Sequence, residues 1–250
     1  MAGARAWLLV IGVAACGGSK LERRHLDHHT EMTPVEVDVA RTFVAPGEHT
    51  LMDLSWYGIP VAQIESAVGE PVTIGGRRLL VVWSELNSDG ALAVIKQLHN
   101  EVTTTLDVGN GLPVETIGSF EALYSGSSRN SVPMERRTWS ADERQHNTHS
   151  ALFLLRSWDP PEGTRGYFTG RVGYGTYRAD VLAAGRELLK TSEGTLPSVR
   201  IEGSVRASGI ETYQFIVWFS DDRDRRPLRI EAESGYGGIV RAELVAYERD

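Results

Sequence analysis

Hydrophobic and polar residues alternate with a period of two along much of this chain. The segments 199–206, 228–233 and 240–246 each place apolar residues or glycine at every second position, with mostly polar residues between them. This period is typical of a β-strand with one buried and one solvated face. Turn signals such as the charged run 221–224 separate these segments. About eleven or twelve such segments between residues 50 and 247 predict an all-β, mainly antiparallel fold. We expect a strongly curved meander sheet that forms a barrel or a half-barrel.

Two of the predicted strands lack a polar face. Residues 79–83 are continuously apolar, and the segment 213–219 carries apolar side chains on both of its faces. Both faces of these strands are therefore expected to meet a second sheet, a covering helix or a ligand. We take Tyr213, Phe215 and Trp218 as candidate residues for binding an apolar ligand.

One short helix is predicted near the middle of the chain, at residues 149–158. This segment shows no alternation, and helical spacing would place Leu152, Leu155 and Trp158 on roughly one face. The pair Pro160-Pro161 gives a stop signal. A strand is the alternative on residue type, but the alanine, leucine and arginine content favours a helix.

The N-terminal segment has the pattern of an export signal. Arg5 precedes an apolar run of eight residues, 6–13, and small residues follow up to Cys16, the one cysteine of the sequence. The run is far shorter than the ~20 apolar residues that span a bilayer, so it predicts an export signal and not a transmembrane helix. Its order resembles the lipobox of bacterial lipoproteins. That resemblance implies cleavage between Ala15 and Cys16 and lipid attachment to the Cys16 thiol; the alternative is an ordinary signal peptide that happens to contain a cysteine.

These patterns divide the chain into a signal peptide (1–15), a lipidated flexible tether (16–46) and a single β-rich domain (47–250). The tether opens with glycines and serine and continues with charged residues and histidines. Alternating valines near residue 35 indicate that a short strand begins there. By resemblance to the Gram-negative sorting rule, Gly17 after the lipidated cysteine favours the outer membrane over the inner membrane, with the domain facing the periplasm.

Composition argues against a nucleic-acid partner and against disulfide bonds within the chain. The formal net charge is −7, from 26 basic and 33 acidic residues. A chain this acidic has no electrostatic reason to bind nucleic acid, so we expect no nucleic-acid partner. With one cysteine, no internal disulfide can form, and the stability of the domain has to come from its core.

Four segments together resemble a bacterial family of exported envelope proteins, the domain of unknown function numbered 3108. They are 47–62, 150–156, 185–195 and 217–231. The resemblance extends in order over about residues 47–247, although the run 125–147 does not align with it. It implies an all-β envelope domain and carries no established activity or catalytic residue.

Histidines are the main candidates for chemistry. His25, His28 and His29 lie close together in the tether, where imidazoles can bind Zn²⁺ or Cu²⁺. A solvated tether is the favoured interpretation, because a metal site needs its ligands held in place by surrounding structure.

A second histidine pair, His146 and His149, has the i, i+3 spacing that places two side chains on one side of a helix. Asp142 and Glu143 lie just upstream, so two metal ligands or an acid–base pair are conceivable. The favoured interpretation is that Asn147 or its neighbour caps the helix.

The sequence contains no G-x-S-x-G, H-E-x-x-H, phosphate-binding or dinucleotide-binding motif. We therefore predict no catalytic residue, no metal and no cofactor. The expected function is that of a non-enzymatic envelope lipoprotein, attached to the membrane by its N-terminal lipid, whose curved sheet binds a lipid or another apolar molecule. The alternative is a structural module that docks an envelope protein. An envelope hydrolase, resting on His146 and His149, is the third hypothesis.

Overall fold

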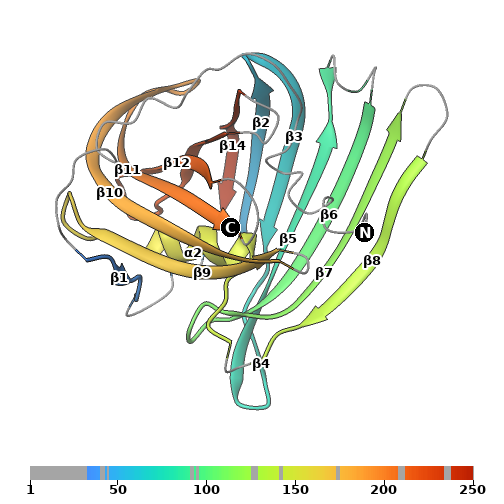
Figure 1. Ribbon diagram of the computed structural model, residues 1–250, viewed down its shortest axis with the longest axis horizontal. Helices are drawn as coiled ribbons and strands as arrows, with labels where there is room; N and C mark the ends of the chain where they lie inside the picture. Colours follow the sequence, from blue (N-terminus) through green and yellow to red (C-terminus); the bar gives the residue numbers. More distant parts are fainter. Residues whose placement is uncertain are drawn as a thin grey trace.

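The computed structural model describes residues 33–39, 43, 45–90, 93, 96–124, 129–140, 143–172, 175–207, 212–233 and 238–249. Within these ranges, fourteen strands form one large curved sheet that does not close, and one helix, α2, lies inside its curve (Figure 1). The elements are β1 (Val35–Glu36), β2 (Glu48–Trp56), β3 (Ile59–Val68), β4 (Val72–Ile74), β5 (Arg77–Ser88), β6 (Lys96–Asp107), β7 (Pro113–Tyr124), β8 (Arg129–Thr138), α2 (Thr148–Ser157), β9 (Arg165–Val172), β10 (Gly175–Thr191), β11 (Gly194–Ala207), β12 (Thr212–Ser220), β13 (Pro227–Glu233) and β14 (Ile239–Arg249). The predicted all-β, mainly antiparallel fold is confirmed.

The strand order makes the sheet a meander with two long-range pairings. It runs β1-β9-β10-β11-β12-β13-β14-β2-β3-β5-β6-β7-β8, and β4 pairs with β5 beside this path. Most strands pair with a near neighbour in sequence, but β1 pairs with β9, and β14, the last described strand, pairs with β2. The described strand pairs are antiparallel apart from β1 with β9. The two ends of the sheet are therefore β8 and the β1–β9 pair.

The apolar residues of the alternating segments form the core on the concave face of the sheet. Ile230, Ala242, Leu54 and Ala62 are consecutive cross-strand partners on β13, β14, β2 and β3. Three of the four are buried, and Ile230 packs against them. Because one face of each strand joins the same apolar row, a slip of one residue in register would expose the whole set.

Helix α2 joins the two halves of the curved sheet. Its Leu154 and Leu155 pack into an apolar cluster formed by β9 to β12, whereas Phe153 packs against Leu80 and Val82 in a cluster of β3, β5 and β6. The helix begins one residue before the predicted start and ends at Ser157, where Trp158 is the C-cap. Among the described residues, no helix has the length and apolar character needed to cross a membrane.

Part of the predicted tether belongs to the folded domain. The short strand expected near residue 35 is β1, which pairs in parallel with β9. Val37 then donates from its backbone N–H to the Tyr167 carbonyl at 2.8 Å, and its side chain is buried. Ala45 is also fully buried. The described sheet thus begins at Val35, twelve residues before the predicted boundary at 47, because β1 pairs with the edge strand β9. Ala15, Cys16, His25, His28 and His29 lie outside the described residues.

Strands β5 and β12 were both expected to be buried on their two faces, but only β12 is. In β5, Leu80 and Val82 are buried, but Val81 is 42% exposed on the outer face, so that expectation is wrong for this segment. In β12, Val217 faces the concave core and Trp218 is buried on the opposite face. The C-terminal part of β10 packs near Trp218. This strand changes register at Gly185, after which Glu187 accepts a hydrogen bond from the indole and Leu189 joins the same apolar cluster.

Candidate functional site

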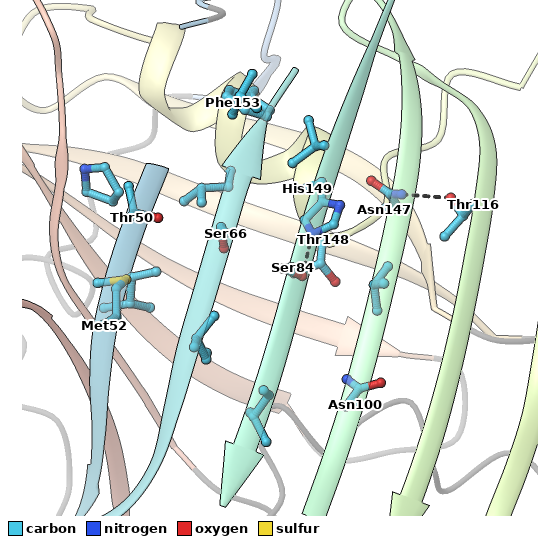
Figure 2. Close-up of a pocket in the computed structure, with 18 of the residues that line it drawn as sticks. Thr50, Met52, Ser66, Ser84, Asn100, Thr116, Asn147, Thr148, His149 and Phe153 are labelled. Atoms are coloured by element: carbon cyan, nitrogen blue, oxygen red, sulfur yellow. Dashed lines mark hydrogen bonds between the residues drawn. The ribbon is translucent and has the colours of Figure 1, made fainter. Parts of the chain in front are cut away.

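A cavity of about 490 Å³ lies between the concave face of the sheet and helix α2 (Figure 2). Strands β2, β3, β5, β6 and β7 provide its wall, and the N-terminal half of α2 provides its cover. Its size is within the usual range for pockets that hold small molecules. The labelled lining residues in Figure 2 are Thr50, Met52, Ser66, Ser84, Asn100, Thr116, Asn147, Thr148, His149 and Phe153.

Sheet register arranges this wall in bands. Thr50, Ser66 and Ser84 are direct cross-strand partners on β2, β3 and β5, so three hydroxyl groups form one row. The neighbouring row, Met52–Ile64–Leu86, is apolar and ends at Asn100 on β6. Val68 and Val82 form an apolar row on the other side. The wall is therefore largely hydrocarbon with one narrow polar stripe, which suits a ligand that is mostly apolar.

The N-terminus of α2 is fixed to the wall by a chain of hydrogen bonds. Asn147 is the N-cap: its side-chain oxygen accepts from the Ser150 N–H at 2.9 Å, and the Ser150 hydroxyl accepts from the Asn147 N–H at 2.9 Å. The Asn147 amide nitrogen donates to Thr104 Oγ1 at 2.8 Å and to Thr116 Oγ1 at 2.9 Å. The predicted capping interpretation is correct, and the cap also ties the helix to β6 and β7.

His149 continues this network into the cavity. Its Nδ1 lies 2.9 Å from Thr104 Oγ1, and its Nε2 lies 2.8 Å from Ser84 Oγ. A serine hydroxyl on an imidazole nitrogen is also the arrangement of a nucleophile and its base, so the direction of the protons decides what this pair can do.

Counting donors favours one direction. Thr104 is fully buried, and its oxygen already accepts from Asn147, so its own hydroxyl proton needs an acceptor. Among the described groups, His149 Nδ1 fills this role. The imidazole proton then lies on Nε2 and is donated to Ser84 Oγ. In this tautomer His149 cannot accept the Ser84 proton, and the Ser84 hydroxyl is left to donate into the cavity.

Burial keeps both histidines neutral. Desolvation lowers the pKa of His149 from 6.5 to about 4, and it lowers the pKa of His146 to about 4, partly opposed by the hydrogen bond with Ser150. The two rings point to different neighbours: His149 contacts Ser84, whereas His146 makes an edge contact with Phe168, 5.7 Å between ring centroids. The suggested metal or acid–base pair is therefore not assembled.

The acidic residues proposed to assist that pair do not complete a site either. Glu143 is exposed and lies 3.9 Å from Arg171, and Asp142 falls outside the described residues. Within the described ranges, no group of three or more histidine, cysteine, aspartate or glutamate side chains is placed to hold a metal ion.

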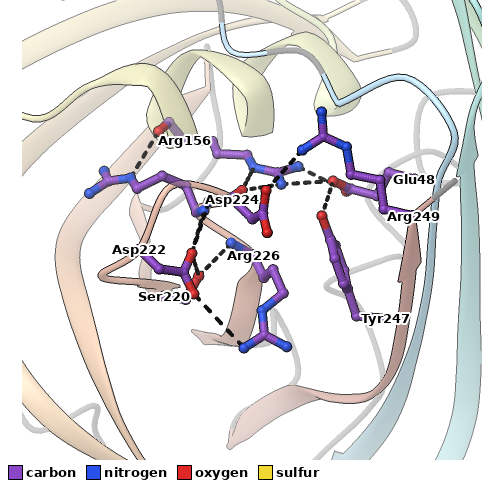
Figure 3. A network of polar contacts seen from close by, with 9 residues as sticks. Glu48, Arg156, Ser220, Asp222, Asp224, Arg226, Tyr247 and Arg249 are labelled. Atoms are coloured by element: carbon purple, nitrogen blue, oxygen red, sulfur yellow. Dashed lines mark hydrogen bonds and ion pairs between the residues drawn. The ribbon is translucent and has the colours of Figure 1, made fainter.

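At the other end of α2, the buried Arg156 lines both the cavity and a charged surface cleft of about 670 Å³. Figure 3 shows the network of polar contacts around this arginine. Arg156, 2% exposed, meets both carboxylate oxygens of Glu48 at 2.8 and 2.7 Å and also donates to the Asp224 carbonyl. Arg225 donates to the carbonyls of Arg156 and Trp158, which is a favourable position for a cation at a helix C-terminus. These arginines are held by protein partners, so we interpret this region as the anchor of the helix.

The three residues predicted to bind an apolar ligand lie elsewhere. Trp218 is buried in the core, where its Nε1 donates to Glu187 at 2.6 Å. Phe215 packs against Gly203, where any larger residue would collide with its ring, and Tyr213 is partly buried on the same strand. None of the three lines the cavity. The strand with two apolar faces is a core strand, and the cavity wall consists of strands that carry hydroxyl groups on their inner face.

Comparison with known proteins finds solved structures that resemble this chain, but no sequence match. No protein-family model and no curated protein matches the chain, so its resemblance to family 3108 stays a prediction. A β-barrel-like protein of domain of unknown function 1849 from Brucella abortus is 10% identical with a TM-score of 0.49, over 82% of this chain and 97% of that chain. A protein with a YmcC-like fold from Bacteroides fragilis, described as exported, is 10% identical with a TM-score of 0.41, over 84% and 100%. A protein described as a lipoprotein from Parabacteroides distasonis is 9% identical with a TM-score of 0.36, over 87% and 100%.

Proposed function

We propose that this protein is a lipid-anchored, non-enzymatic protein of the cell envelope that holds an apolar ligand, such as an acyl chain, between its curved sheet and helix α2. The observation that carries the proposal is the 490 Å³ cavity with its apolar rows on either side of a single hydroxyl stripe. An acyl chain would cover the apolar rows, and Ser84 would supply a hydrogen bond where the ligand is polar.

A cavity-filling substitution tests this proposal directly. Ser66 lies in the middle of the hydroxyl row, so Ser66→Phe would place a ring where the ligand is expected. We expect this variant to lose uptake of a fluorescent fatty acid and to lose any lipid that the wild-type domain retains in native mass spectrometry without detergent. Gln63→Phe is the matched control, because Gln63 is exposed on the outer face of the same strand. Equal lipid binding by both variants, or no binding by the wild type, would contradict the proposal.

Attachment to the membrane is a separate part of the proposal, supported by the lipobox-like pattern before Cys16. A single acyl chain binds a membrane only marginally, whereas several chains on one residue hold it stably. In cells grown with radiolabelled palmitate, the wild-type protein should carry label and Cys16→Ser should carry none. Label that persists in the variant would show that lipid is attached elsewhere or that Cys16 belongs to an ordinary signal peptide. We further propose attachment at the outer membrane, on the periplasmic side.

The alternative of a docking module is supported by one feature, the edge of β8, which pairs only with β7 in the described sheet. Charged side chains discourage pairing of such an edge with another strand. The Arg136 side chain on β8 is 70% exposed. We therefore favour the cavity. A hydrolase is disfavoured by the assigned His149 tautomer, in which the Nε2 proton prevents His149 from acting as a base for Ser84.

A further inference from the structure

Arginines gather where the cavity reaches the two ends of the sheet. Arg136 and Arg137 on β8 and Arg171 on β9 all line it, and Glu135 is the one acidic residue that lines it beside them. The fourth lining arginine, Arg156, is neutralised by Glu48 at the opposite end. The chain as a whole has 33 acidic and 26 basic residues. The side chains that line the cavity thus include four arginines and two glutamates, a local excess of basic residues in a chain that is acidic overall.

Of the two β8 arginines, Arg137 lies on the side of the strand that faces the cavity. Arg137 is the cross-strand partner of Thr116, a lining residue that holds the Asn147 cap, so it stands on the concave side of β8. The Arg137 guanidinium lies 5.1 Å from the centroid of the buried Trp139 ring, which gives it an apolar backing. Arg136 faces outward, and its ion pair with Glu115, at 3.3 Å, leaves it 70% exposed.

Arg171 approaches from the other end of the sheet. Its Nε is buried and has no hydrogen-bond partner, and its Nη1 lies 3.9 Å from Glu143, beyond hydrogen-bond distance. A buried donor without a partner is rare in a native structure and calls for an explanation. A ligand that brings an acceptor to this rim would supply that partner.

We propose that the ligand of this cavity is an amphiphile with an acyl chain and an anionic head group, and that Arg137 and Arg171 bind the head group at the rim. The inference rests on the proposed function, since it places the acyl chain against the apolar rows of the wall. Guanidinium groups match carboxylates and phosphates with paired hydrogen bonds, and such charge-assisted bonds are stronger than neutral ones. The carboxylate of a fatty acid and the phosphate of a lysophospholipid share this chemistry.

Three ligands that share one unsaturated hydrocarbon chain and differ in head group distinguish the contribution of the head group from that of the chain. Calorimetry or fluorescence displacement on the full chain would compare oleate, oleoyl lysophosphatidic acid and neutral oleyl alcohol. We expect at least one anionic ligand to bind about tenfold or more tightly than the alcohol, since hydrogen bonds to charged groups contribute about 1.5–3 kcal/mol. A preference for oleate or for the lysophospholipid would identify the head group. Added salt should lower the affinity for the anionic ligand and leave the affinity for the alcohol unchanged.

Arg137→Gln and Arg171→Gln should each reduce this preference while leaving the affinity for oleyl alcohol unchanged. Arg241→Gln is the control, because Arg241 is an exposed arginine on the outer face of β14, paired with Glu231. Thermal unfolding verifies that each variant is folded, and either arginine variant alone suffices as a test. If the alcohol binds as tightly as both anionic ligands, or if both variants keep the preference, the head-group proposal is overturned and the cavity proposal stands. If no ligand binds, both proposals fall.

Discussion

Replacing Arg156 by methionine should destabilise the domain by about 3–5 kcal/mol, because the substitution leaves the Glu48 carboxylate buried without its cation. Glu48 is 5% exposed, and apart from Arg156 its described side-chain partner is the Tyr247 hydroxyl, at 3.2 Å. The loss would be read from urea unfolding as a lower midpoint at an unchanged slope.

Two variants make this expectation specific. Arg249→Met removes a partly exposed ion pair with Asp224 from the same network and should cost only about 0–1 kcal/mol. Adding Glu48→Leu to Arg156→Met should restore part of the stability, because the unpaired carboxylate is then gone. Equal losses for Arg156→Met and Arg249→Met would show that burial of the Arg156 pair does not set its contribution.

The second large effect is a loss of stability in mild acid. His146 and His149 have folded-state pKa values lowered to about 4, against 6.5 when unfolded. Between these values the unfolded chain binds more protons than the folded one, so the free energy of unfolding rises with pH across this window and falls as pH drops from about 6.5 toward 4. Each shift corresponds to about 3 kcal/mol at full protonation of the unfolded state.

This effect is tested by measuring the free energy of unfolding between pH 7 and 4 for the wild type and for variants that lack the buried histidines. Carboxylates also titrate in the lower part of the window, so the wild type is compared with His146→Gln and His149→Gln, which cannot be protonated there. Glutamine keeps both a donor and an acceptor for the Ser84 and Thr104 contacts. The double variant, which lacks both buried histidines, should lose less stability on acidification. Parallel curves for the wild type and the double variant would show that the two rings titrate normally in the fold.

The sequence predicts the architecture here better than the site. Alternation at 228–233 and 240–246 locates strands because each of them has one face in the core, and helix α2 is found because its residues lack that alternation. The order of the strands and the pairing of β14 with β2 depend on contacts far apart in the chain, which a local pattern does not encode.

A ligand in the curved sheet was expected, but the residues that line the cavity were missed because their pattern resembles a solvated face. Thr50, Ser66 and Ser84 are polar residues on strand faces that point inward, and polarity alone assigns such residues to solvent. The opposite error affects Trp218, whose apolar neighbours suggested a ligand although protein covers it. One usable signal was present in the sequence. Arg156 interrupts an apolar helix, and a charge at such a position requires a buried partner.

The pairing of β2 with β14 has a consequence for synthesis of the protein. One edge of β2, the first long strand, is paired only when β14 is present. The hydrogen bond between Tyr247 and Glu48 likewise joins residues 199 positions apart. Until the final strand leaves the ribosome, β2 has an unpaired edge and the apolar row across β13, β14, β2 and β3 is incomplete. Contacts this distant in sequence form slowly. The nascent chain therefore cannot complete its sheet until β14 has been synthesised, and until then the β2 edge stays open for pairing.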